Sequence, residues 1–171
     1  VFIKSNCPTL CCTILDAISS VYHSDNANYF ILESQHTLPQ FAEKIHLKTL
    51  EIQEKFFQLL EFIVFQLNFV PCKELISLSI LLKSQHSVSC SIICMQTLLN
   101  IVKHNSIFKD VYREVGILEV FVTCLQRYAN ILKLKEQAAE NGNEYIIRSD
   151  DEQLATLVMN CLLVLLGGNT N

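Results

Sequence analysis

The stretch from Asn105 to Val120, "NSIFKDVYREVGILEV", decides the fold of this chain. Asn105 is a good N-terminal cap, and the apolar residues that follow it predict a short helix. Gly116 suits a left-handed backbone conformation that ends this helix and redirects the chain. Apolar residues at helical spacing then predict a long helix from Ile117 to about Leu134. The stretch therefore encodes a short helix, a sharp turn and a long helix.

The same order of elements is predicted near the start of the chain. Asp25 or Asn26 can cap a short helix that includes residues 29–32, "YFIL". After a polar turn, Thr37 can cap a second helix, and Pro39 lies in its first turn, where proline is tolerated. The local pattern around Gly116 thus has an earlier counterpart around Thr37.

The distance between the two patterns indicates a repeat. Tyr29 precedes Thr37 by the same interval that separates Phe108 from Gly116. The two sites are two units of roughly 40 residues apart, which is the period of armadillo and HEAT repeats. We therefore predict an armadillo/HEAT-like α-solenoid, and a compact helical bundle stays open as the alternative.

The remaining sequence predicts further helices and no sheet. Nothing alternates with period two over a useful length, and four glycines and three prolines are too few turns for a sheet protein. Apolar periodicity predicts helices near residues 8–21, 49–68, 71–82, 87–103 and 154–165. A loop is expected at 84–87, a flexible loop at 137–151, and a stop at Gly167 and Gly168.

Each of these helices is expected to bury one face. In the first helix the predicted inward residues are Leu10, Ile14, Ala17, Ile18 and Val21. In the helix after Pro71 they are Leu75, Ile76, Leu78, Ile80 and Leu82. Residues 49–68 are apolar over more than half of the helix circumference, so this helix is expected to be mostly buried.

The composition is rich in apolar residues for a globular chain. Half of the 171 residues are apolar, 18% are charged and the mean hydropathy is +0.31. The surface of so many apolar side chains must be buried inside a stack of helices or against further sequence of a longer protein, and we expect both. Val1 is accordingly expected to be an internal position, because there is neither an initiator Met nor an apolar signal core.

Charge and cysteine usage narrow the class of protein. The net charge of −4 argues against nucleic-acid partners. The densest pair of positive charges is Lys133 and Lys135, and the nearby Glu136 and Glu140 offset it. No apolar stretch of about 18 residues could span a bilayer, so no direct membrane insertion is expected. Most of the eight cysteines lie within apolar runs and are interpreted as core residues in a reducing cytosol.

Few residues form the pattern of a catalytic, phosphate-binding or metal-binding site. The glycines lack the spacing of a phosphate-binding loop, and no serine is bracketed by glycines as in a nucleophile elbow. Cys90 and Cys94 are four residues apart, but a zinc site needs a second pair, and His86 and His104 lie at opposite ends of the same helix. Cys72 is the only candidate nucleophile, at a helix start beside a lysine. We expect no catalytic, cofactor or metal site, and hence no enzyme.

Three other motifs have simple structural interpretations. Asp150, Asp151 and Glu152 fit the first turn of the last helix, where the helix dipole favours acidic residues. The tetrapeptides at 29–32 and 112–115 resemble docking motifs, but they fall within predicted helices rather than extended strands. Gln96 and Asn100 form a fragment of the amide ladder that a peptide-binding armadillo protein would carry.

Four stretches carry a resemblance to a known family. They are "DNANYFILESQHTLPQFAEKI" at 25–45, "NFVPCKELISLSILLKS" at 68–84, "IFKDVYREVGILEV" at 107–120 and "LATLVMNCLLVLLGGNTN" at 154–171. In their order they resemble the N-terminal armadillo-like region of the BEACH-domain proteins that carry WD repeats and a FYVE finger. The resemblance covers nearly the whole chain and is weakest at 46–53 and 137–151.

This resemblance implies a very large cytosolic scaffold that associates with membranes through distal modules. In the best-known members the scaffold links aggregates or other cargo to selective autophagy, and part of the protein is nuclear. The family's FYVE finger, BEACH domain, WD repeats and autophagy docking motif lie elsewhere, so no functional residue is carried over to this chain.

The leading hypothesis is therefore a non-enzymatic scaffold segment, residues 1–171, that binds unidentified protein partners. A second hypothesis is an adaptor that holds one peptide or helix in a concave groove. A third, a cysteine-dependent enzyme built on Cys72, is the least favoured.

Overall fold

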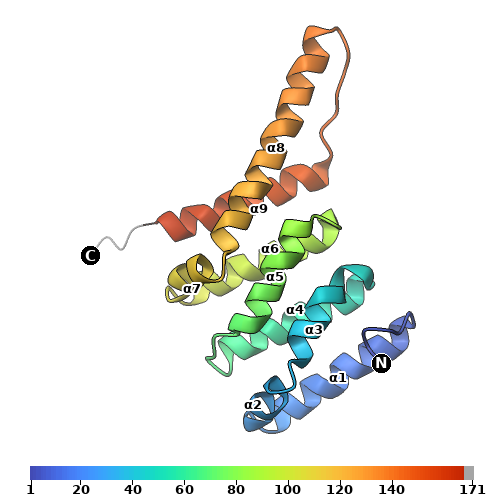
Figure 1. Ribbon diagram of the computed structural model, residues 1–171, viewed down its shortest axis with the longest axis vertical. Coiled ribbons are helices and arrows are strands. Elements are labelled where there is room, and N and C mark those ends of the chain that lie inside the picture. Colours follow the sequence, from blue (N-terminus) through green and yellow to red (C-terminus); the bar gives the residue numbers. More distant parts are fainter. Residues whose placement is uncertain (168–171) are drawn as a thin grey trace.

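The computed structural model describes residues 1–167 and is helical throughout its regular structure (Figure 1). The α-helices are α1 (Pro8–Ser24), α2 (Ala27–Glu33), α3 (Thr37–Lys44), α4 (Leu50–Phe65), α5 (Cys72–Ser84), α6 (Val88–His104), α7 (Phe108–Glu114), α8 (Ile117–Glu140) and α9 (Ser149–Leu166). A short 3₁₀ helix, η1 (Ile45–Leu47), follows α3. The all-α prediction is confirmed.

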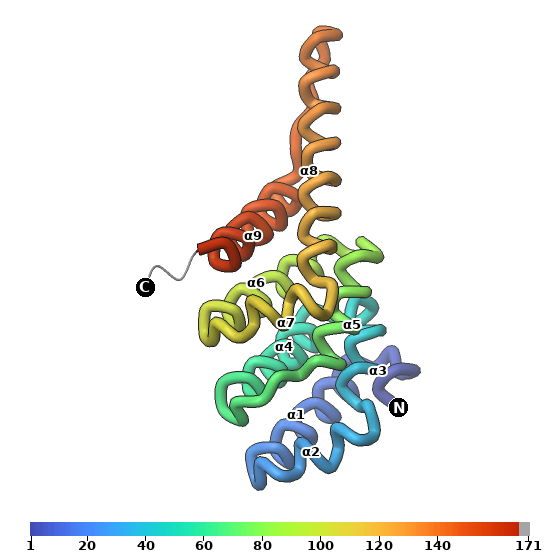
Figure 2. Tube along the Cα trace, turned by 60° about the vertical axis from the view of Figure 1, so that its left-hand side comes forward, coloured from blue at the N-terminus to red at the C-terminus, as the bar shows by residue number. Residues whose placement is uncertain are grey.

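The helices form two layers that run along the chain (Figure 2). In one layer, α1 packs on α4, α4 on α6 and α6 on α9; we refer to these four helices as the ladder layer. In the second layer, α3 packs on α5 and α5 on α8. The short helices α2 and α7 connect the layers. Packing between successive neighbours is the arrangement of a helical-repeat stack, as the sequence predicts.

The two turns that suggested the repeat are both present. Gly116 joins α7 to α8 in the left-handed region with φ of 81°. In the earlier turn His36 takes the left-handed conformation, with φ of 54°, and Thr37 is the first residue of α3. The prediction of Thr37 as a side-chain cap is therefore wrong, because the residue before it makes the turn. The predicted cap Ser87 is correct, since its Oγ accepts a hydrogen bond from the backbone N–H of Cys90.

Two helix ends differ from the predictions. Helix α8 continues to Glu140, so the expected loop 137–151 is non-helical only at 141–148, and α9 already begins at Ser149. The residues of 137–140, "QAAE", are strong helix formers, and the chain leaves the helix only near Gly142, which has a φ of 77°. Helix α4 ends at Phe65 rather than near residue 68, because Asn68 is left-handed. Gly167 follows α9 as predicted, whereas Gly168 lies outside the described residues.

The far half of α8 and the segment 141–148 project from the stack (Figure 2). Helix α6 begins 38 residues after α4, but α9 begins 61 residues after α6. The additional residues are accommodated in this projection, which carries the exposed Lys133 and Lys135. The unit between α6 and α9 therefore contains an insertion, a common feature of repeat proteins.

The predicted inward faces are wrong for two helices. Helix α1 buries Cys11, Leu15 and Tyr22 against the stack, while Leu10, Ala17 and Val21 are exposed and Ile14 and Ile18 are half-buried. Helix α5 buries Leu75, Leu78 and Leu82 as predicted, but Ile76 and Ile80 face outward, 45% and 60% exposed. Apolar residues cover more than one face in both helices, so periodicity alone selects no single inward face.

No single helix within residues 1–167 combines the length and apolar composition needed to span a bilayer. Helices α7 and α8 reach that composition only when taken together, and they are bent by 77° at the break between them.

Candidate partner-binding surface

The exposed side of the ladder layer carries contacts at one fixed sequence separation. Lys55 of α4 forms an ion pair with Asp16 of α1, with 2.7 Å between Nζ and Oδ1. Asn100 of α6 donates from Nδ2 to Oε1 of Glu61 on α4, over 3.1 Å. In both pairs the two residues are 39 positions apart in the sequence. Equivalent positions of successive units therefore contact one another, as stacking of repeats requires.

Two aromatic contacts have the same separation. His23 of α1 stacks on Phe62 of α4, with ring centroids 4.1 Å apart, and Phe65 lies against His104 of α6 at 4.5 Å. The numbers of the residues in each pair again differ by 39. These four side chains lie near the C-terminal ends of α1, α4 and α6. The ends of three neighbouring helices thus form a row of imidazole and phenyl rings.

In the structure, the predicted pair of amide side chains, Gln96 and Asn100, is extended by a carboxylate of α4. Gln96 donates from Nε2 to Oδ1 of Asn100 over 3.1 Å, and Asn100 continues the series to Glu61. Glu61 and Asn100 are half-buried, and Gln96 is exposed. The sequence signal was the amides at helical spacing on α6, whereas Glu61 and the rings of α4 were missed. They belong to a different helix, and only the packing of α4 on α6 brings the groups together.

The cysteines interpreted as core residues are mostly buried. Cys11, Cys90, Cys94, Cys124 and Cys161 are buried and Cys12 is half-buried. Burial raises the pKa of Cys90 and of Cys161 to about 12, and it also raises the pKa of Cys94. The reactive thiolate is therefore disfavoured at these positions. These residues serve as small apolar groups of the core.

Cys72 lies exposed at the first residue of α5. The lysine beside it, Lys73, is directed to α2, where its Nζ lies 2.9 Å from Oε1 of Glu33. Its charge is thus partly balanced by this carboxylate rather than held free for the thiol. The geometry gives no support to a nucleophile at this position.

The two histidines considered as metal ligands are separated. His86 precedes α6 and stacks on His46 of η1, with ring centroids 5.0 Å apart, whereas His104 ends α6 beside Phe65. Burial, followed by the neighbouring His86 and Lys44, lowers the pKa of His46. Within residues 1–167 no three His, Cys, Asp or Glu side chains converge as metal ligands would.

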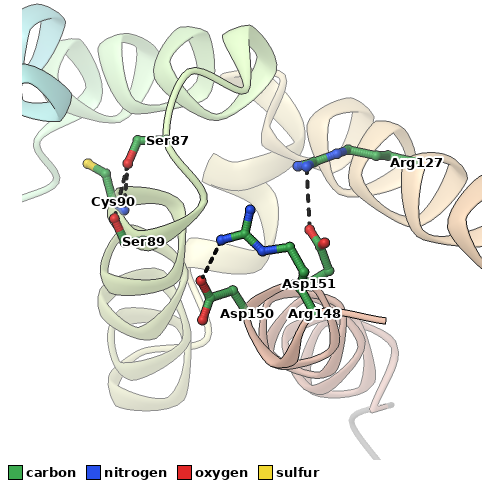
Figure 3. A network of polar contacts seen from close by, with 7 residues as sticks. All are labelled: Ser87, Ser89, Cys90, Arg127, Arg148, Asp150 and Asp151. Atoms are coloured by element: carbon green, nitrogen blue, oxygen red, sulfur yellow. Dashed lines mark hydrogen bonds and ion pairs between the residues drawn. The ribbon is translucent and has the colours of Figure 1, made fainter. Parts of the chain in front are cut away.

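The acidic residues of 150–152 occupy the first turn of α9, as predicted (Figure 3). Two of them also pair with arginines. Oδ1 of Asp151 lies 3.3 Å from Nη2 of Arg127 on α8, and Oδ2 of Asp150 lies 3.4 Å from Nη2 of Arg148. The contact of Asp151 with Arg127 fastens the start of α9 to the base of the projecting half of α8, whereas the contact of Asp150 with Arg148 is local to the start of α9.

The tetrapeptides that resemble docking motifs lie in α2 and at the C-terminal end of α7, where only Val115 is outside the helix, and their tyrosines are buried. Tyr29 donates from Oη to Oε1 of Glu74 over 3.2 Å, and Tyr112 donates to the backbone oxygen of Leu98 over 2.6 Å. Both tyrosine side chains are fully buried. Neither segment is available as an extended strand for a partner's sheet. Sequence reasoning missed the buried carboxyl of Glu74.

Comparison with known proteins identifies relatives. The chain is 30% identical over 98% of its length to WD repeat- and FYVE domain-containing protein 4 of Mus musculus, and 30% identical over 99% to that of Homo sapiens. It is 26% identical over 75% of its length to BEACH domain-containing protein A2 of Arabidopsis thaliana. The chain spans 4–5% of the length of these relatives.

These matches confirm the family resemblance stated from the sequence. No protein-family model matches the chain, and no solved structure matches it.

Proposed function

Because this chain corresponds, over nearly its whole length, to a segment of the large WD-repeat, FYVE-domain and BEACH-family proteins, we propose that it is a non-enzymatic scaffold segment. Its stacked helices present surfaces to protein partners and set the spacing between distant modules of a larger protein. The observation that carries this proposal is the apolar surface left open at both ends of the ladder layer.

At the first end, α1 exposes the side that points away from α4. Leu10 and Val21 are 41% and 42% exposed, and Ala17 is exposed between them. With the half-buried Ile14, they follow the spacing 10, 14, 17 and 21, which places them on one side of a helix. This stripe has the pattern of a helix-packing face rather than of a hydrated one.

At the other end, α9 exposes a similar stripe. Met159, Leu163 and Leu166 are 43%, 68% and 78% exposed and follow helical spacing. The inner helices α4 and α6 each have a ladder-layer neighbour on both sides, whereas α1 and α9 have one each. We propose that further repeats of the full-length protein cover both stripes, because exposed apolar stripes favour association.

The test is the association state of the 171-residue chain. Sedimentation at increasing concentration should show self-association, which Val21→Lys and Leu163→Lys together should reduce while leaving the melting temperature unchanged. The matched control is Ile80→Lys, because Ile80 is 60% exposed but lies on α5, outside the exposed apolar stripes of α1 and α9, which we call the end faces. A chain that stays monomeric, or a control that acts as strongly as the end-face variants, would contradict the proposal.

The finer role rests on the family resemblance. We propose that the full-length protein acts in the cytosol and at membranes and links cargo, such as protein aggregates, to the selective autophagy machinery. Removing this segment from the full-length protein should leave membrane recruitment by distal modules intact and reduce recruitment of cargo. Fluorescence microscopy of tagged full-length and shortened protein checks this, and unchanged cargo recruitment would oppose the role.

The series Gln96, Asn100 and Glu61 favours a second function, an adaptor for one extended peptide. Amide side chains both donate and accept hydrogen bonds, so they match the alternating groups of an extended backbone. This function and the scaffold function are compatible, since a scaffold also needs a defined place for its partner.

A further inference from the structure

We propose that the ladder layer binds an extended partner segment through one basic side chain, lysine or arginine, placed at Glu61 beside Phe65. This inference rests on the proposed scaffold function and gives it a specific partner-binding position. Its chemistry follows from the direction of the hydrogen bonds, from the aromatic ring beside the carboxylate and from the nearby charged side chains.

The hydrogen bonds run in one direction and end at a carboxylate. Gln96 donates to Asn100, and Asn100 donates to Glu61. The orientation of the Asn100 amide is fixed by this arrangement, because a carboxylate only accepts and so must face the amide nitrogen. An ionised carboxylate has about four acceptor positions, of which Asn100 fills one. The series therefore presents acceptors to a partner that supplies donors.

Among residues 1–167 Glu61 has no ion pair with a lysine or arginine. Its half-buried position makes a charged partner more favourable than it would be in open water, because screening by solvent is weaker there. A lysine or arginine of a partner would supply both the missing charge and the missing donors.

One phenyl ring lies on the same side of α4 as this carboxylate. Phe65 is one helical turn beyond Glu61 and half-buried, and its ring lies against His104 of α6. Phe62, in contrast, faces α1, where it stacks on His23. The face of an aromatic ring attracts a cation within about 6 Å of its centroid. A carboxylate with one neighbouring phenyl ring therefore suits an aliphatic stem that ends in a positive charge, as in lysine and arginine.

The surrounding charges favour a basic partner. Helix α4 has Glu51, Glu54 and Glu61 at helical spacing on its exposed side, and its Lys55 is already paired with Asp16. Lys103 is exposed on α6, close enough to Cys161 of α9 to lower the pKa of that thiol against the larger effect of burial. The lysine of α4 is thus already paired, and the exposed side of this helix otherwise carries carboxylates.

The geometry of the layer suits an extended segment. Neighbouring helices pack about 8–10 Å apart, and an extended chain rises about 3.3 Å per residue. A partner strand that crosses the layer therefore advances about three residues from one helix to the next. Its backbone can meet the amides of Gln96 and Asn100 while one side chain reaches Glu61.

The experiment uses the 171-residue chain and a short acetylated glycine peptide with one central arginine. Proton–nitrogen correlation spectra of the chain report the side-chain amides of Asn100 and Gln96 directly. The arginine peptide should shift both signals in a saturable manner, and the same peptide with uncharged citrulline should not. Equal shifts with citrulline, or no shift with arginine, would overturn the proposal.

Glu61→Gln tests the charge without removing the acceptor for Asn100, so the fold should be retained. It should weaken binding of the arginine peptide by about fivefold, the effect of a single charge pair worth about 1 kcal/mol. Glu43→Gln is the matched control, because Glu43 is exposed on α3 in the other layer and the change in net charge is the same. Equal weakening by both variants would show a diffuse charge effect and would overturn the site.

Phe65→Leu provides an independent variant that keeps the carboxylate and most of the apolar volume. It should weaken the arginine peptide and leave the melting temperature within a few degrees of the unsubstituted chain. Failure of this site would leave the end-face stripes of α1 and α9 unaffected, so sedimentation with Val21→Lys and Leu163→Lys separates it from failure of the scaffold function.

Discussion

Tyr29 of α2 donates a hydrogen bond from Oη to Oε1 of Glu74 on α5 over 3.2 Å, and both side chains are buried, at 0% and 1% exposed. The rings of Tyr22 and Tyr29 pack in a T-shaped arrangement, with ring centroids 5.5 Å apart. A carboxyl group in the core thus joins α5 of the second layer to the connecting helix α2. Burial raises the pKa of Glu74 above its usual value of 4.5, although its hydrogen bonds act in the opposite direction.

This carboxyl makes stability depend on pH. Because the folded-state pKa lies above the unfolded-state value, the folded chain binds the proton more tightly than the unfolded chain. The contribution of protonated Glu74 to the stability of the fold is complete below pH 4.5 and is lost as the pH rises through the folded-state pKa of this carboxyl. Glu74→Gln should remove this slope and raise the free energy of unfolding at neutral pH, as measured by urea unfolding over a pH series. Parallel curves for Glu74→Gln and the unsubstituted chain would contradict this assignment, and Glu43→Gln controls for net charge.

Tyr29→Phe removes the hydroxyl donor and leaves the buried carboxyl of Glu74 without this partner. The free energy of unfolding should fall by about 1–3 kcal/mol, the cost of a buried polar group that loses its hydrogen bond. Urea unfolding at neutral pH measures the loss, and the loss should be smaller in the Glu74→Gln background because an amide is neutral. Equal losses in the two backgrounds would show that the carboxylate charge is not involved.

Gly116→Ala tests the turn between α7 and α8. The φ of 81° lies in the left-handed region, and a Cβ at this position meets no atom within 4 Å, so the cost comes from the backbone alone. We expect a loss of about 1–2 kcal/mol in the free energy of unfolding. Gly142→Ala is the control, with a φ of 77° in the exposed connection to α9, where relaxation should make the loss smaller. No loss at Gly116 would contradict a fixed left-handed turn.

Thiol labelling tests the assignment of the cysteines. Cys7 and Cys72 are exposed and should react rapidly with a disulfide reagent in the folded chain. The five buried cysteines should react only on unfolding, because burial hinders access and, at most of them, disfavours the thiolate. Cys72→Ser should remove one fast-reacting group, and a fast reaction at Cys94 would oppose its place in the core.

Local signals in the sequence predicted much of the fold. Gly116 and Ser87 act within one turn of the chain, so their roles follow from neighbouring residues alone. The repeat was detectable because Tyr29 and Phe108 precede equivalent turns, and both side chains are buried. The end of α8 was missed because the chain there is polar, although its residues favour a helix.

The buried faces and the candidate site depended on packing between distant elements. Helix α1 has apolar residues on two sides, and contact with α4 decides that Leu15 is inside and Val21 is outside. Glu61 and Asn100 come from different helices and meet through a separation of 39 residues that no local pattern reveals. A buried glutamate such as Glu74 contradicts the usual expectation for its residue type.

The most direct test of the central claim is thermal unfolding, with light scattering, of this chain and of the same protein lengthened by about 40 residues, roughly one repeat, at each end. The proposed stack predicts a higher and more cooperative melting transition for the longer protein, together with less self-association, because the stripes of α1 and α9 are then covered. An unchanged melting temperature and a clean monomer at both lengths would contradict it and would identify a self-contained helical domain.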